Sequence, residues 1–483
     1  MKLKYLLFAV SVVMMAAFAA SCSEDDSFTT SPSHLLTFST DTVKLDTIFS
    51  TVPTATQSFW VYNRSGDGIR CTSVRLERGN QTGFRVNVDG AYLGQASGYQ
   101  VPDIEVRNKD SIRVFVELTS PQTGSDKPKK IEDNLVFMLE SGVQQKVNLN
   151  AFSWDATILR NPVVSNDSVI TASDKPLIIY GGLTVKEGAT LTITEGSTLY
   201  FHGDAGIDVY GTLLTQGTAE NNVVLRGDRI DRMFDYLPYD FVSGQWQGIH
   251  FYEKSYDNKI VYTDIHSTFN GIVCDSADVY KEKLLLQNST IHNCQGHGLI
   301  AYNCLTRVYN CQLSNTLGDC LSIHGGQCDV NNTTLAQYYP FDANRGVALR
   351  FSAIEHPLLM FKCQNTLVTG YADDEVMGET GEEATTFVYQ FDHCIMRTPE
   401  VEEEMKAQFV DVIFENPEDT ITGGKKHFAK IDTDNLRYDF RLDTISPAVN
   451  AADPLTALPI DRDGRTRDDQ PDIGCFESFK TEE

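Results

Sequence analysis

Short runs of alternating apolar and polar residues dominate the first part of the chain. Between about residues 36 and 156 the runs are five to seven residues long, as in 58–62 and 112–118, and turn-forming clusters such as 64–68 separate them. Alternation with a period of two is typical of half-buried β-strands. About seven or eight such strands in roughly 120 residues predict an antiparallel β-sandwich.

After residue 157 the predicted strands become shorter and glycine marks the turns between them. Segments such as 183–185, 191–193 and 207–209 are followed by a turn within a few residues, with a glycine every six to ten positions. Strands this short favour coils that stack on one another over hairpins.

A repeat with a period in the low twenties follows. Its apolar anchors lie 26, 22, 22, 32 and 28 positions apart, at Ile265, Ile291, Leu313, Leu335, Leu367 and Ile395. Asparagines precede three of these anchors by three residues, at 288, 310 and 332. Such a period fits one turn of a β-solenoid with three short strands and three bends. We expect the asparagines to lie in register, to adopt the left-handed conformation of a bend, and to bond the next coil through their amides.

The repeat resembles the right-handed parallel β-helix superfamily, the pectate-lyase-like fold, over residues 183–225 and 249–395. The end of the chain is also similar to the closing segment of many secreted β-helix proteins, with Ser-Pro-Ala-Val-Asn at 446–450 and Pro-Asp-Ile-Gly-Cys-Phe-Glu at 471–477. Residues 36–156 look like the Ig-like modules that precede such domains in surface lipoproteins. The resemblance implies an all-β chain in which an N-terminal Ig-like β-sandwich is followed by a right-handed single-stranded parallel β-helix. It implies no single activity, because the superfamily includes lyases, hydrolases, adhesins and structural proteins.

The N-terminus reads as a processing signal. Lys2 and Lys4 precede an apolar run over residues 6–20, and Cys22 follows small residues and precedes an acidic stretch at 23–26. This arrangement resembles a lipoprotein signal of surface-displayed proteins in Bacteroidota, with Cys22 as the lipidated residue. An ordinary secretory peptide with a chance cysteine is the alternative. We therefore expect a lipid anchor, palmitate included, in the outer membrane, with the protein facing the cell exterior.

These patterns divide the chain into five predicted parts. They are a signal peptide at 1–21, a flexible tether at 22–35, an Ig-like sandwich at 36–156, a β-helix at 157–440 and a closing segment at 441–483.

The charge and the cysteine content of the chain limit which partners, metals and cofactors are expected. The chain has 66 Asp and Glu against 40 Lys and Arg, a net charge of −26, so binding to nucleic acid is not expected. None of the 11 cysteines forms a CxxC pair or a zinc-site spacing with histidine, so we expect no metal and no cofactor. Acidic stretches near 373–375 and 400–404 leave calcium as an alternative. Cysteines of the repeat are expected to stack, reduced, in the core; a Cys304–Cys328 disulfide is the alternative.

One column of outward residues is the candidate ligand face. Five strands begin after a glycine or its equivalent, and the fourth residue after that start points outward: Tyr252, Asp275, Tyr302, His324 and Arg350. Aromatic rings stack on sugars and the polar side chains supply hydrogen bonds and charge. The column therefore predicts a polysaccharide ligand; a solvated sheet face without a ligand is the alternative.

The expected function is glycan binding or a structural role at the cell surface. The alternative is a polysaccharide lyase or glycoside hydrolase acting on the same face. His324 would then be the base, Arg350 would hold a uronate, and Asp275 is the one carboxylate of the column, whereas a hydrolase needs two. Trp246 is a further candidate for sugar stacking, with a core position as the alternative.

Overall fold

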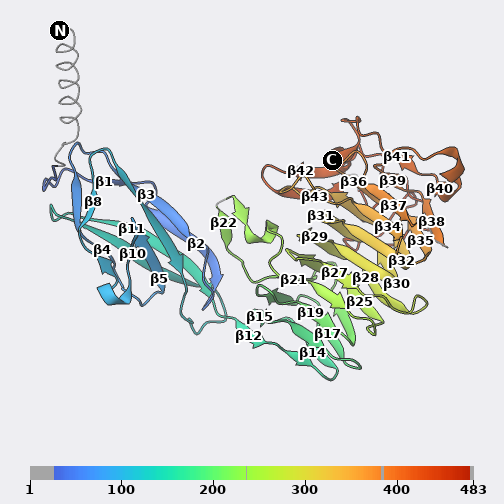
Figure 1. Ribbon diagram of the computed structural model, residues 1–483, viewed down its shortest axis with the longest axis horizontal. Helices are drawn as coiled ribbons and strands as arrows, with labels where there is room; N and C mark the ends of the chain where they lie inside the picture. The colour runs from blue at the N-terminus through green and yellow to red at the C-terminus, as the bar shows by residue number, and fades with distance from the viewer. Residues whose placement is uncertain (1–26, 235, 382–385, 479–483) are drawn as a thin grey trace, which may run out of the picture. The chain divides into compact units, whose positions relative to one another are not determined.

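The computed structural model describes residues 27–234, 236–381 and 386–478 (Figure 1). Two compact units are present: residues up to 123 together with 128–153, and residues 124–127 together with 154 onward. Cys22 and the predicted signal peptide lie outside the described residues. Within the part of the chain that is described, no helix has the length and hydrophobicity to cross a bilayer.

The first unit is an antiparallel sandwich of two sheets. One sheet has the order β1-β3-β9-β5-β6 and the other the order β2-β11-β10-β4-β7, with β8 paired to β4. The strands are β1 (Leu36–Phe38), β2 (Thr42–Phe49), β3 (Gln57–Asn63), β4 (Ile69–Leu76), β5 (Phe84–Val88), β6 (Ala91–Tyr92), β7 (Gln100–Val101), β8 (Ile104–Val106), β9 (Ser111–Leu118), β10 (Lys129–Leu139) and β11 (Gln144–Trp154), and η1 is a short 3₁₀ helix at Gln95–Ser97.

The alternation seen in the sequence places every second side chain of these strands in the core. In β9, Ile112, Val114, Val116 and Leu118 are buried, whereas Phe115 is exposed. Phe28, within the predicted tether, forms a bridge with Gly68 and lies under the guanidinium of Arg70, 4.6 Å from its ring centroid. The immunoglobulin-like layout of the sandwich remains a prediction.

The second unit is a parallel β-helix with three strands per coil, as the all-β prediction required (Figure 1). Most coils contribute two strands to a 17-stranded sheet and one to an 11-stranded sheet, and in two coils the first two strands are continuous, as β30 and β32. The larger sheet consists of β13 (Val163–Val164), β14 (Ser168–Ile170), β16 (Leu183–Val185), β17 (Thr190–Thr194), β19 (Ile207–Val209), β20 (Thr212–Gln216), β24 (Ile249–Phe251), β25 (Asn258–Val261), β27 (Ile272–Cys274), β28 (Glu282–Gln287), β30 (Leu299–Tyr309), β32 (Leu321–Asn331), β34 (Leu349–Ala353), β35 (Leu358–Gln364), β37 (Val376–Thr380), β38 (Phe387–Asp392) and β40 (Phe409–Val410). The smaller sheet consists of β12 (Thr157–Arg160), β15 (Leu177–Tyr180), β18 (Thr198–Phe201), β21 (Val223–Gly227), β26 (Thr263–His266), β29 (Thr290–Cys294), β31 (Gln312–Thr316), β33 (Thr334–Gln337), β36 (Leu367–Gly370), β39 (Ile395–Met396) and β41 (Ile413–Phe414).

Columns of equivalent apolar residues fill the interior of the β-helix. One buried column runs through successive coils at Leu183, Ile207, Ile249, Ile272, Leu299, Leu321 and Leu349. Parallel strands in register bring residues some twenty positions apart to adjacent places in the sheet. Each apolar side chain of the column is covered by its equivalents on the coils above and below. Its burial therefore stabilises the stacking of neighbouring coils through the hydrophobic effect.

The predicted asparagine bend is confirmed, whereas the predicted ladder of amide bonds through Asn288, Asn310 and Asn332 is wrong. Asn288, Asn310, Asn332 and Asn365 follow paired strand residues and have φ values of 49°, 51°, 44° and 47°. Their amides do not form a continuous ladder along the column, although Asn365 Nδ2 donates to Asn331 Oδ1 of the preceding coil at 2.9 Å. Three of them bond the C-terminal segment instead: Asn310 Nδ2 donates to the carbonyl of Ile460, Asn332 Oδ1 accepts from the Leu458 amide, and Asn365 Oδ1 accepts from the Asp453 amide.

This C-terminal segment, residues 424–478, packs on the outer surface of the smaller sheet. It contains the hairpin β42 (Phe428–Asp432) and β43 (Arg437–Leu442) and the 3₁₀ helix η4 (Gly424–His427). Leu367 and Ile395, predicted as inward anchors, pack beneath it, and their neighbours Val368 and Met396 occupy the interior column instead. The prediction for those two residues is wrong because the segment makes both faces of these strands apolar. The other short elements are β22 (Arg232–Phe234), β23 (Leu237–Pro238), η2 (Tyr239–Phe241) and η3 (Glu403–Gln408).

The cysteines of the described residues are all buried and unbridged. Cys304 pairs with Gly326 and Cys328 with Thr306, so the two thiols are offset by two residues along neighbouring strands and form no disulfide. Burial raises the pKa of the Cys294 and Cys311 thiols to about 12. The thiols therefore stay protonated and act as small apolar side chains of the core, as expected from the sequence.

Candidate ligand-binding surfaces of the β-helix

Four of the five predicted ligand residues lie in one outward column. Tyr252, Asp275, Tyr302 and His324 each follow a member of the inward column that pairs Phe251, Cys274, Ala301 and Ile323. We call these four residues the outer-strand face. Their role in ligand binding remains a proposal.

Arg350 does not belong to that column. Arg350 pairs with Ser322, and His324 pairs with Ser352, so the sequence alignment of this strand is wrong by two residues. The prediction counts four residues from Gly346, which precedes the true strand start by two residues. The residue equivalent to Cys320 is Ala348, since Leu321 pairs with Leu349.

Tyr252 and Asp275 of the outer-strand face are already in contact with neighbouring side chains of the protein. His250 Nε2 lies 2.8 Å from Asp275 Oδ1, and Tyr252 Oη donates to Asp208 Oδ1 at 3.1 Å. The Tyr252 ring is stacked between those of Tyr210 and His250, at 4.1 and 4.0 Å between centroids. A ring covered on both sides cannot stack on a sugar, so Tyr252 offers its edge and its hydroxyl rather than a flat face.

A second polar cluster surrounds the buried carboxylate of Asp319. Its Oδ2 accepts from Arg350 Nε at 2.7 Å and from Ser322 Oγ at 3.1 Å, and Arg350 Nη1 donates to Glu379 at 2.8 Å. His324 Nε2 lies 3.0 Å from Ser322 Oγ, and burial together with the charges of His297 and Arg350 lowers the pKa of His324. The guanidinium of Arg350 is thus neutralised by two carboxylates of the protein itself.

The outer-strand face borders a groove of about 590 Å³. Carboxylates of Glu253, Asp275 and Asp278 line it together with Tyr302 and His356. The groove is therefore acidic, which opposes the binding of a uronate.

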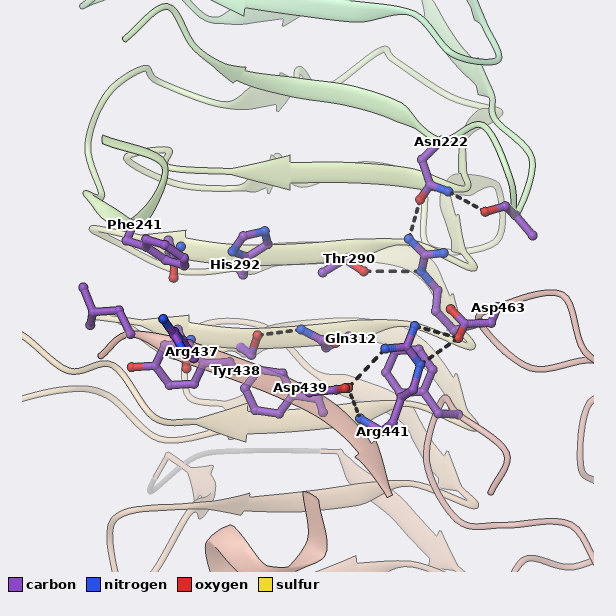
Figure 2. A pocket seen from close by; sticks show the side chains of 18 residues that line it. Asn222, Phe241, Thr290, His292, Gln312, Arg437, Tyr438, Asp439, Arg441 and Asp463 are labelled. Carbon is purple, nitrogen blue, oxygen red and sulfur yellow. Dashed lines mark hydrogen bonds and ion pairs between the residues drawn. The ribbon is translucent and has the colours of Figure 1, made fainter. Parts of the chain in front are cut away.

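A different cleft of about 590 Å³ lies between the smaller sheet and the C-terminal segment (Figure 2). We call it the C-terminal cleft. Phe241 and His292 lie at one end of it and Asn222 and Asp463 at the other (Figure 2). The lining residues are Ala219, Asn222, Phe241, Thr290, His292, Asn293, Gln312, Ser314, Asn315, Leu436, Arg437, Tyr438, Asp439, Phe440, Arg441, Arg462, Asp463 and Phe476.

Two arginines fix the walls of the C-terminal cleft. Arg462 donates to Thr290 Oγ1 at 3.3 Å and to Asn222 Oδ1 at 2.5 Å, which ties the closing segment to the sheet (Figure 2). Arg441 pairs with Asp439 and with Asp463, at 3.2 and 2.9 Å. Arg462 thus joins the C-terminal segment to the β-helix, and Arg441 links two parts of that segment to each other.

Other groups of the C-terminal cleft lack partners. Tyr438 Oη and Asn315 Oδ1 are buried and form no hydrogen bond within the described part of the chain. Burial raises the pKa of Tyr438, so its hydroxyl keeps its proton. Polar atoms that are withdrawn from bulk water without a partner cost free energy, which a ligand that bonds to them would offset.

Sequence reasoning did not find this cleft. Its walls come from the strands near residues 290–315 and from segments at 436–441 and 462–476, which no spacing rule connects. The conspicuous end of the chain was the one available signal, since Arg462 and Asp463 lie in its Asp-Arg-Asp-Gly stretch.

Two groups of side chains in the described residues have the composition of a metal site. Asp264, His266 and His292 offer three ligand atoms within 4.8 Å of one another. Although burial acts in the opposite direction, Asp264 raises the pKa of His266 to about 9, and the two histidines hold the pKa of Asp264 well below its usual value. In the second group, the ligand atoms of Asp392, His393 and Asp453 also lie within 4.8 Å of one another.

Comparison with known proteins supports the fold and leaves the activity open. A sequence model of the right-handed β-helix region matches residues 147–352. A stretch of 72 residues is 38% identical to Protein bark beetle of Drosophila melanogaster; it covers 15% of this chain and only 2% of the length of that protein.

Solved structures resemble the chain weakly. The catalytic unit of a GH87 α-1,3-glucanase from Streptomyces thermodiastaticus is 8% identical, with 74% of this chain and 88% of that chain covered and a TM-score of 0.21. A family 123 glycoside hydrolase from Clostridium perfringens is 4% identical over 29% of this chain and 30% of that chain, with a TM-score of 0.18. A PapD-like domain of human CEP192 is 10% identical over 28% of this chain and 98% of that domain, with a TM-score of 0.17. These similarities are too weak to assign an activity.

Proposed function

We propose that the β-helix binds a carbohydrate chain in the C-terminal cleft. The observation that carries the proposal is the pair of buried atoms without partners, Tyr438 Oη and Asn315 Oδ1, in a cleft of about 590 Å³. Carbohydrates present many hydroxyls that both donate and accept, together with apolar ring faces. The cleft combines such polar groups with Phe241, Phe440 and Phe476.

The exchange of Tyr438 for phenylalanine tests this proposal. We expect the variant to lose about tenfold in affinity for the carbohydrate that the wild-type chain binds, equivalent to about 1.4 kcal/mol. The fold should be unharmed, because removal of a buried hydroxyl without a partner is neutral or stabilising. A panel of soluble polysaccharides and arrayed glycans, followed by isothermal titration with the best ligand, measures both quantities.

Tyr302→Phe on the outer-strand face is the matched control and should bind as the wild type does. Loss of binding in the control but not in Tyr438→Phe would move the site to the groove beside the outer-strand face. Absence of binding to every glycan of the panel would contradict the proposal.

A glycoside hydrolase active in the acidic groove is the second candidate function. Hydrolysis requires two carboxyl groups on either side of the scissile bond, and Glu253, Asp275 and Asp278 line the same groove. A lyase acting on uronates through His324 and Arg350 has less support, since Arg350 is already paired with Asp319 and Glu379. Release of reducing ends that Asp275→Asn abolishes would favour the hydrolase.

We further propose that Cys22 anchors the protein to the outer membrane through lipid. The proposal is supported by the lysines, the apolar run and the acidic stretch around Cys22 in the sequence. The Cys22→Ala variant should move from the membrane fraction to the soluble fraction, as measured by immunoblotting after fractionation. A variant that stays in the membrane fraction would exclude lipidation as the anchor.

A further inference from the structure

Three potential metal ligands face the same side of the smaller sheet on two adjacent coils. His266 and His292 are paired in register between β26 and β29, and their rings stack with centroids 4.9 Å apart. Asp264 lies two residues before His266 in the same strand, and therefore on the same face of the sheet. Because parallel register fixes all three, the arrangement is built by the backbone.

Their ligand atoms lie within 4.8 Å of one another, and two of the separations are close to those of a tetrahedral site. Asp264 Oδ1 is 2.8 Å from His266 Nδ1 and 3.3 Å from His292 Nε2. Ligand atoms bound to zinc at about 2.0–2.1 Å in a tetrahedron are separated by roughly 3.3 Å. Binding of an ion requires His266 to release its proton and the two imidazoles, now 23° from parallel, to turn until the lone pairs in their ring planes converge.

Outer partners of the cluster are also in place. If His266 binds through Nδ1, its Nε2 faces Asp240 Oδ1 at 3.6 Å, and Asp240 is in turn paired with Arg226. A carboxylate behind a metal-bound histidine fixes the orientation of the ring and makes it a better ligand. Asp240 also offsets the positive charge of Arg226, which would otherwise oppose a cation.

We propose that Asp264, His266 and His292 bind one divalent transition-metal ion, with zinc as the best-suited metal. Two imidazoles and one carboxylate are ligands typical of zinc, and three protein ligands leave a position open for water or a ligand oxygen. His292 also lines the C-terminal cleft, so the ion lies at the margin of that cleft. The metal site stands independently of the proposed carbohydrate ligand.

Cobalt substitution tests the site directly. The full chain, stripped of metal with a chelator, is titrated with cobalt chloride and then with zinc chloride. We expect the visible absorption of tetrahedral cobalt to appear at one equivalent and to vanish on addition of zinc. His292→Ala should abolish the band, and Asp240→Asn should weaken zinc affinity about 10–100-fold, the usual effect of losing such an outer partner.

His250→Ala is the matched control, because His250 also pairs with a carboxylate, that of Asp275, on another face of the β-helix. This variant should bind cobalt as the wild type does. His292→Gln serves as a second variant, and circular dichroism checks that each variant is folded. No tetrahedral band in the wild type, or an unchanged band in folded His292→Ala or His292→Gln, would overturn the proposal. Glycan binding measured in chelator keeps this result separate from the proposed function.

Discussion

Replacement of Arg467 by alanine should lower the free energy of unfolding of the β-helix by about 3–5 kcal/mol, the usual cost of breaking a buried ion pair from one side. Arg467 Nη1 pairs with Glu477 at 2.8 Å, and both side chains are only 2% exposed. Arg467 Nη2 also donates to Asn310 Oδ1 in the bend column. The variant would leave the buried carboxylate of Glu477 without its cation and would detach the C-terminal segment from the solenoid.

Urea unfolding measures this loss of stability. Two further variants test whether the loss comes from the buried ion pair. Arg441→Ala is the control, because Arg441 is 49% exposed and its ion pairs should contribute less than about 1 kcal/mol. The double variant Arg467→Met with Glu477→Met should recover much of the stability, since it removes both charges together. Equal stability of Arg467→Ala and the wild type would show that the closing segment contributes little to the solenoid.

Trp246→Ala should cost a similar 3–5 kcal/mol, because it opens a large cavity in the core. Trp246 is fully buried, its ring is stacked on Phe201 at 4.2 Å, and Nε1 donates to the carbonyl of His266 at 2.8 Å. The structure thus places this residue in the core, so the sugar-stacking hypothesis for it is wrong. Equilibrium unfolding in urea gives the difference.

The control for Trp246 is Trp60, which is 40% exposed on the sandwich. Trp60→Ala should change the free energy of unfolding by less than about 1 kcal/mol. If Trp246→Ala were as mild as Trp60→Ala, the region around Trp246 would have to relax and close the cavity.

Most of the fold could be predicted because the β-helix repeats a local rule. The spacing of Ile265, Ile291, Leu313 and Leu335 gave the interior column, and asparagine at the bend gave the left-handed turn. The rule failed at Leu367, where the closing segment covers the outer surface and makes two adjacent positions apolar. Periodicity cannot show which of two apolar neighbours faces inward when both are buried.

The candidate sites were less predictable than the fold. The outer-strand face was found because its residues belong to one repeat, and Arg350 was misplaced because a loop shifts the strand start by two residues. The C-terminal cleft and the histidine cluster depend on which distant segments meet. Nothing in the sequence singles out His266 and His292, since a spacing of 26 positions is informative only once the register of the coils is known.

The buried thiols can report where the solenoid opens transiently. Free cysteines are distributed from Cys274 on one coil to Cys394 several coils later, with Cys71 in the sandwich and Cys475 in the closing segment. A thiol inaccessible in the native state reacts with an alkylating reagent only when its surroundings open transiently. Timed alkylation followed by peptide mass spectrometry would therefore rank the coils by how often each one opens, without any substitution in the chain.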